Sequence, residues 1–121
     1  MMIATLLVAG ACVRAASTPT APDPLHTDGD KYHLVLDNQF VRVLRYHDEP
    51  GAMTHLHYHP CFVMYALGPF KRELGFADGS RRTREFHEGQ AIWMPAQSHT
   101  GHNVGATPTE ALLVEFKGPC G

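Results

Sequence analysis

From about residue 31 onward, apolar and polar residues alternate in short runs that are separated by turn-forming residues. The run VRVLRY at 41–46 is typical of a strand with one face on a core and the other in solvent. We expect strands over residues 32–36, 41–46, 54–59, 61–67, 71–77, 82–87, 90–94 and 110–117. About eight short strands, with no helical periodicity of useful length, predict an all-β sandwich or barrel.

Turn-forming residues punctuate these runs. The chain has 121 residues with eleven glycines and nine prolines, which favours many turns and short strands. Asp78-Gly79-Ser80 is a tight hairpin turn, and Pro95 ends a strand because proline has no backbone N–H to donate. Residues 101–109 are expected to form a loop.

The first residues differ from the rest of the chain. The apolar run from Ile3 to Val13 is too short to span a bilayer, and a segment rich in Ala, Ser, Thr and Pro follows it through Pro24. This order resembles a secretory signal peptide with cleavage before Ala16, or a lipoprotein leader with a lipid anchor at Cys12, although no Lys or Arg precedes the run. Either reading predicts export to the periplasm or envelope; a disordered N-terminus that is no leader would leave the protein cytoplasmic.

The predicted organisation is therefore one domain. We expect residues 1–29 to form a leader and disordered linker, residues 30–118 the folded domain, and residues 119–121 a tail.

Charge and motifs exclude several classes of function. The formal net charge is −2 and basic residues are scattered, apart from Arg81, Arg82 and Arg84 in a hairpin arm, so nothing predicts a nucleic-acid partner. The chain has no G-x-S-x-G, no phosphate-binding G-x4-G-K-[ST] and no C-x2-C. A small-molecule ligand or substrate is the expected partner.

Histidine is the unusual residue, with nine in the chain. His55, His57 and His59 alternate within one predicted strand, so their side chains point to one face. His99 follows the strand that ends at Pro95. We expect His57, His59 and His99 to hold one divalent ion, of Fe, Zn, Ni, Cu or Mn, and His55 to be either a fourth ligand or a residue at the rim.

Two half-motifs here resemble those of the cupin superfamily. Gly51 is followed by five residues and then His57-Tyr58-His59, as in the first cupin motif; Gly89 is followed by five residues and then Pro95, and His99 to Asn103 fits the closing H-x3-N of the second. The resemblance covers most of residues 38–117. It implies a single jelly-roll β-barrel of about eight antiparallel strands around a metal site.

The departures from the cupin motifs are informative. The glutamate of the first motif would fall at Val63 or Met64, which leaves three histidines, as in the thiol dioxygenases, and favours Fe, Zn, Ni or Cu over Mn. In the second motif, Ala96-Gln97 stands where a glycine is usual, and the histidine lies one residue closer to the proline.

The pattern of apolar and polar residues does not decide which of the remaining side chains line the pocket. Either Phe62/Met64/Ala66 or Val63/Tyr65/Leu67 lines the interior. Glu115 is the best carboxylate for acid–base work if it faces inward, and Trp93 is a pocket wall or, more simply, a core residue.

The cysteines leave a similar choice. Cys61 lies beside His59 in sequence, so it is a thiol near the metal, a partner of Cys120, or an unpaired thiol.

The resemblance implies metal chemistry without fixing the reaction. A metal-dependent small-molecule enzyme is our first hypothesis, with an oxygenase favoured over an isomerase or lyase by the three-histidine set. The alternative is a non-catalytic cupin of the cell envelope that binds a small ligand. A homodimer formed through edge strands is expected in either case.

Overall fold

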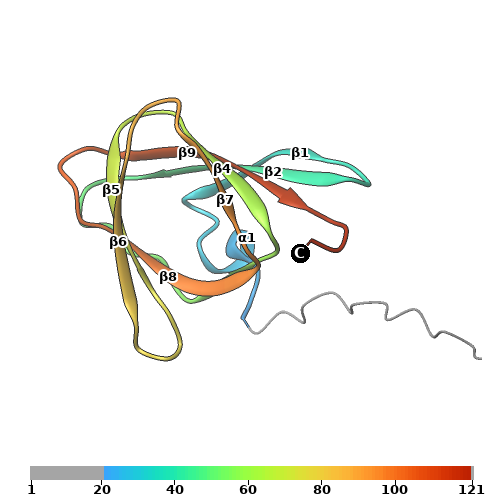
Figure 1. Ribbon diagram of the computed structural model, residues 1–121, viewed down its shortest axis with the longest axis horizontal. Coiled ribbons are helices and arrows are strands. Elements are labelled where there is room, and N and C mark those ends of the chain that lie inside the picture. The colour runs from blue at the N-terminus through green and yellow to red at the C-terminus, as the bar shows by residue number, and fades with distance from the viewer. Residues whose placement is uncertain (1–20, 121) are drawn as a thin grey trace, which may run out of the picture.

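The structure is a computed structural model that describes residues 21–120, so the predicted leader and the lipid anchor at Cys12 lie outside the described residues. It contains nine strands in this part of the chain and one helical turn (Figure 1). The strands are β1 Tyr32–Asp37, β2 Val41–Asp48, β3 His57–His59, β4 Phe62–Ala66, β5 Phe70–Gly75, β6 Arg81–Phe86, β7 Ala91–Met94, β8 Gln97–Asn103 and β9 Thr109–Phe116.

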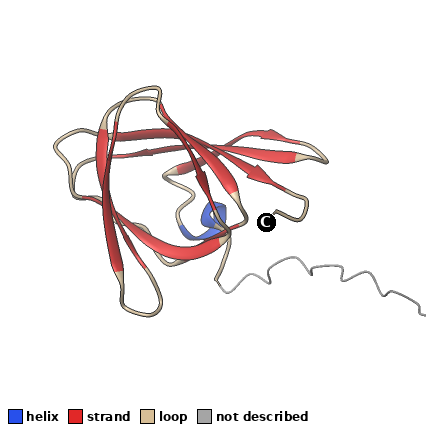
Figure 2. Cartoon of the chain, in the orientation of Figure 1, coloured by secondary structure: helices blue, strands red, loops and turns tan. Residues whose placement is uncertain are grey.

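The strands form two antiparallel sheets. One sheet has the order β1-β2-β9-β4-β7, and the other has the order β3-β8-β5-β6. Figure 2 shows that strands and connecting loops make up almost all of the described chain, with one helical turn drawn within the outline of the strands. The all-β jelly-roll expected from the sequence is confirmed.

Most of the core lies on the inner face of the five-stranded sheet, and Phe70 of β5 and Phe86 of β6 complete it from the other sheet. β2 pairs with β9 without interruption from Val41↔Phe116 to Asp48↔Thr109. The inward-facing side chains of the two strands therefore lie opposite one another along their whole length. Leu44 and Tyr46 of β2 are buried against the inner residues of β9 and β4. On β4 the buried set is Phe62, Met64 and Ala66, which settles which parity faces the interior.

The four-stranded sheet differs from the expectation. Residues 97–103 form β8 where the sequence predicted a loop from residue 101, and β3 begins at His57 rather than at Thr54. β8 is difficult to recognise because its sequence is QSHTGHN and its buried positions are His99, Gly101 and Asn103. A strand whose inner face is polar lacks the apolar alternation from which strands are predicted.

Residues 21–29, which the sequence assigned to a linker, are folded against strands of both sheets, with α1 in contact with β1 and β3. α1 spans Pro24–Thr27, with Asp23 as its N-cap accepting a hydrogen bond from the Leu25 N–H at 2.9 Å. Proline suits the first position of a helix because its missing N–H would have no partner there. The Tyr58 N–H of β3 donates to the carbonyl of Pro22 at 2.9 Å, which ties this segment to the strand that carries the histidines.

A disulfide joins Cys61, immediately before β4, to Cys120, across a Cα–Cα distance of 6.2 Å. The covalent bond fastens the end of the chain beside β4 and leaves neither cysteine as a free thiol. Within residues 21–120, no helix is long and apolar enough to cross a membrane.

Candidate metal centre

Three buried histidines meet where β3 and β8 run side by side. His57 and His59 lie on the inner face of β3, and His57 pairs in register with His99 of β8. One ring nitrogen from each residue lies within 4.8 Å of those of the other two. The fold therefore brings these three residues together as expected, and we refer to them as the histidine cluster.

Each ring of the cluster is oriented through its Nδ1 atom. The Nδ1 of His57 donates to the carbonyl of His55 at 2.8 Å, that of His59 to the Glu115 carboxylate at 2.7 Å, and that of His99 to the Gln97 side chain at 2.8 Å. The amide of Gln97 is itself fixed by donation to the carbonyl of Pro95. With Nδ1 protonated, the free lone pair of each ring is on Nε2, which is the tautomer of a metal-bound imidazole.

Burial keeps the cluster in the form that metals bind. Loss of solvent lowers the pKa of His57 and lowers the pKa values of His59 and His99 well below their ordinary value, and for His59 and His99 the neighbouring histidines add to the effect. The Nε2 of His59 is buried and has no hydrogen-bond partner among the described residues. A buried polar atom is rarely left in this state, and a metal ion would satisfy it.

Glu115 faces inward, and its carboxylate points to His59 and does not line the cavity. Its side chain is 1% exposed, and its second oxygen accepts from Arg42 at 2.7 Å. Burial raises the pKa of Glu115, while the hydrogen bond and the charge of Arg42 oppose that rise. Arg42 in turn pairs with Asp23 at 2.7 Å, so a chain of charged groups runs from the N-terminal segment to His59.

His55 does not join the cluster, so the expectation of a fourth ligand is corrected. It precedes β3, its side chain is 79% exposed, and its Nδ1 lies 3.0 Å from the buried carboxylate of Asp28. The same carboxylate accepts from the backbone N–H of His55. His55 therefore contributes its carbonyl, which holds the ring of His57.

Tyr32 is a site residue that the sequence pattern did not single out. Its hydroxyl lies 3.2 Å from the Nε2 of His57, and its ring is buried against His57 and His59. Burial raises the pKa of Tyr32 above its ordinary value, so the phenol stays protonated. Its position as the first residue of a predicted strand gave no signal of this role.

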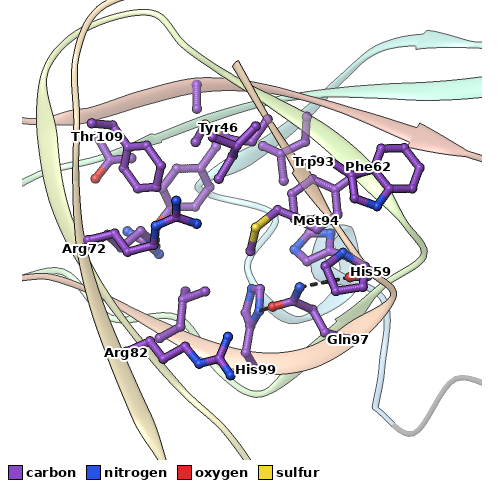
Figure 3. A pocket seen from close by; sticks show the side chains of 18 of the residues that line it. Tyr46, His59, Phe62, Arg72, Arg82, Trp93, Met94, Gln97, His99 and Thr109 are labelled. Carbon is purple, nitrogen blue, oxygen red and sulfur yellow. Dashed lines mark hydrogen bonds between the residues drawn. The ribbon is translucent and has the colours of Figure 1, made fainter. Parts of the chain in front are cut away.

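A cavity of about 540 Å³ opens from the histidine cluster into the interior between the sheets (Figure 3). His59 and His99 form part of its wall, and most of the rest is apolar or aromatic. Met64, one of the two positions at which the cupin motif has its glutamate, lines the cavity. The charged groups in its lining are Arg72, Arg82, Arg84 and Asp78.

Arg72 is part of the scaffold of the cavity. Its guanidinium donates to Asp48 at 2.8 Å and to the Tyr46 hydroxyl at 2.9 Å, and it lies 4.6 Å from the centre of the Tyr46 ring. Asn103 donates to the same aspartate at 3.1 Å. A Cβ at residue 101 would come within 2.2 Å of the Arg72 side chain, so a larger residue there would displace the guanidinium from its place beside Asp48.

Two residues left open by the sequence are now placed. Trp93 lines the cavity, is 54% exposed and packs against Phe116 at 5.5 Å between ring centres, so it is a pocket wall and not a core residue. Cys61 is bonded to Cys120, so it contributes no thiol to the metal centre.

Comparison with solved structures shows that the chain shares the fold of cupin proteins. It is 22% identical to a cupin domain from Bordetella pertussis Tohama I, over 72% of this chain and 92% of that one, with a TM-score of 0.66. It is 31% identical to an oxalate decarboxylase from Bacillus subtilis, over 63% of this chain but only 21% of that one, with a TM-score of 0.50. It is also similar to the polyketide cyclase RemF from Streptomyces resistomycificus, at 21% identity, with coverage of 70% and 63% and a TM-score of 0.55. No protein-family model and no curated protein matches the chain.

Proposed function

The chain has the fold of the cupin superfamily, and from that premise we propose that it is a metal-dependent enzyme acting on a small molecule. In this proposal His57, His59 and His99 hold one divalent ion at the wall of the cavity. One observation supports it above the others: three buried imidazoles have their Nε2 lone pairs directed together, and the Nε2 of His59 has no hydrogen-bond partner among the described residues, while that of His57 lies 3.2 Å from the Tyr32 hydroxyl.

The chain's own residues would do three things around such an ion. Glu115, Gln97 and the carbonyl of His55 fix the ring orientations, so that no reorganisation is needed on binding. The apolar lining excludes water from the reacting groups. Tyr32 supplies a protonated hydroxyl beside His57. The ion itself would act as a Lewis acid or as a redox centre.

Within this proposal we favour an oxygenase over an isomerase or lyase. The cluster contains three neutral nitrogen donors and no carboxylate, since Glu115 is engaged by His59 and Arg42. Such a donor set suits Fe, Zn, Ni or Cu better than a hard ion. Of these, iron and copper support oxygen chemistry.

A non-catalytic binding protein is the second candidate, and the lining of the cavity favours it. The one carboxylate among the described residues of that lining is Asp78, whose Oδ1 accepts from the N–H and hydroxyl of Ser80. A cavity of this kind holds a ligand but offers few groups that can move a proton during a reaction.

Metal analysis of the purified full chain tests the proposal. We expect about one ion of a transition metal per chain, with occupancy lost in His57→Ala and His99→Ala and retained in His33→Ala, which changes an exposed histidine of β1. Failure of the native protein to bind stoichiometric iron, zinc, nickel or copper would overturn it. Oxygen consumption by the iron-loaded protein with candidate substrates then separates an oxygenase from a binding protein.

Export and self-association are part of the proposal. The Cys61–Cys120 disulfide supports a location outside the reducing cytosol. Leu34, Leu36 and Phe40, in and beside the edge strand β1, are about half exposed or more, and a second copy of the chain would cover them. The sedimentation mass of the purified protein distinguishes a dimer from a monomer.

A further inference from the structure

The hairpin of β5 and β6 carries its charges differently on its two faces. On the outer face they are paired: Arg81 lies 2.7 Å from Glu73, and Lys71 lies 4.0 Å from Glu85. These are ordinary surface ion pairs, each of small value to stability. The outer face therefore carries its own counter-charges.

On the inner face of the same hairpin the positive charge is only partly balanced, by Asp78 at the turn, which also lines the cavity. Hydrogen bonds from Ser80 and, to a smaller extent, the charge of Arg82 hold the pKa of Asp78 below its ordinary value. Arg82 and Arg84 line the cavity, and neither has a carboxylate within ion-pair distance among the described residues. Their guanidinium groups lie over aromatic rings instead, Arg82 at 5.7 Å from the centre of the Phe76 ring and Arg84 at 5.4 Å from that of Phe86. We call these two residues the arginine pair.

The pairing of β5 with β6 makes this arrangement of charges unfavourable for the stability of the sheet. Arg84 lies directly opposite Arg72 across the strands, and like charges in opposite positions destabilise a sheet. Asp48 neutralises Arg72 but makes no contact with Arg84. A chain with a formal net charge of −2 thus has a cavity lined by three arginines and one carboxylate, that of Asp78.

The arginine pair and the histidine cluster border the same space. The Phe76 ring lies beside Arg82 and also 6.3 Å from the His99 ring, centre to centre. Figure 3 shows the side chains of Arg82 and His99 on the same side of the cavity, with Met94 and Phe62 along the wall. A ligand bound to the pair would therefore rest its body on apolar side chains and reach towards the histidines.

We propose that the cavity binds a small organic anion, a carboxylate or a phosphate monoester on an apolar body, whose charged group is held by Arg82 and Arg84. A guanidinium binds either group through paired N–H···O hydrogen bonds. The volume of about 540 Å³ suits a ligand of metabolite size. This inference rests on the proposed function in that it names the ligand class of the same cavity.

Calorimetric titration of the full chain, as purified and after treatment with a chelator, tests the inference. The probes are 3-phenylpropionate, phenyl phosphate and the neutral 3-phenylpropanamide. We expect at least one anion to bind about tenfold or more tightly than the amide, and to lose about tenfold in affinity in Arg82→Gln and in Arg84→Gln. Arg81→Gln, the same change on the outer face, should lose less than about twofold.

The outcomes are separable from those of the metal experiment. Equal binding of anion and amide, an equal loss in Arg81→Gln, or no binding of any probe would overturn the anion site. If phenyl phosphate binds and 3-phenylpropionate does not, the ligand is a phosphate ester. Anion binding that persists after chelation, in a chain that fails to bind metal, would leave this inference standing while the proposed function falls.

Discussion

The histidine cluster and the arginine pair line one cavity but are built in opposite ways. His57, His59 and His99 are buried, and each Nδ1 has its own acceptor within 2.8 Å. Arg82 and Arg84 are exposed at the hairpin and lie over aromatic faces, with no carboxylate within ion-pair distance among residues 21–120. The first group is fixed before anything binds, whereas the second keeps its hydrogen-bond donors free.

This difference separates two kinds of ligand contact. A metal ion needs nitrogen atoms held in one geometry, and networks behind the ligands provide it. An organic anion that enters and leaves needs charge that the protein has not already neutralised. Arg72 shows the contrast most clearly, because it faces the same cavity as Arg84 but is already bonded to Asp48 and Tyr46.

Replacing Arg72 should have the largest effect on stability. Asp48 is 1% exposed, and Arg72→Gln would leave its carboxylate buried without a counter-charge, at a cost of about 3–5 kcal/mol in the free energy of unfolding. Arg84→Gln, directly across the strands, should change that free energy by less than about 0.5 kcal/mol because it breaks no ion pair. Urea unfolding of both variants measures the difference; similar losses would show that the two arginines do not differ as described.

Replacing Glu115 should weaken metal binding without abolishing it. Glu115→Gln keeps the shape of the side chain but removes the charge that holds the Nδ1 of His59, so we expect metal affinity to fall about 10- to 100-fold. Glu110→Gln changes a carboxylate on the same strand that pairs with Arg45 and His47 instead, and should leave the affinity unchanged. Competition with a chromogenic chelator gives both affinities. An unchanged value for Glu115→Gln would show that it does not position His59.

The Asp48–Arg72 pair should also leave a signature in the pH dependence of stability. Burial raises the pKa of Asp48, but hydrogen bonds from Tyr46 and Arg72 and the charge of Arg72 outweigh it and hold the pKa below its ordinary value. A carboxyl whose folded pKa is depressed stabilises the fold above its unfolded pKa, and this contribution is lost as the pH falls through the folded pKa.

The stability difference between the wild type and Asp48→Asn should therefore be constant near neutral pH and shrink below about pH 4. Urea unfolding in a series of buffers measures it. A difference that stays constant down to pH 2 would contradict the assignment.

Much of the fold follows from local pattern. β2 and β4 bury one parity of apolar residues each, and the turn at Asp78-Gly79-Ser80 falls where predicted, with Gly79 at a φ of +85°. The spacing of His57 and His59 on one strand face, with His99 from the second cupin half-motif, predicted that these three residues act together, and the structure places His99 opposite His57 on the neighbouring strand.

The parts that could not be predicted depend on contacts between distant strands. In β9 both parities look apolar, and the set Leu112, Val114 and Phe116 is the more hydrophobic one, yet the structure buries Ala111, Leu113 and Glu115. The choice is made by Arg42 and His59, which lie 73 and 56 residues away from Glu115 in sequence. Local periodicity contains no information about such partners.

The folded segment before β1 determines where this protein can be shortened. A chain that began at residue 30, the boundary suggested by the strand pattern, would lack Asp23, the salt-bridge partner of Arg42, and Asp28, which holds the backbone of His55. Its Tyr58 N–H would also lose the carbonyl of Pro22. Expression designs and domain boundaries should therefore keep residue 21 and everything after it, because the folding unit starts upstream of its first strand.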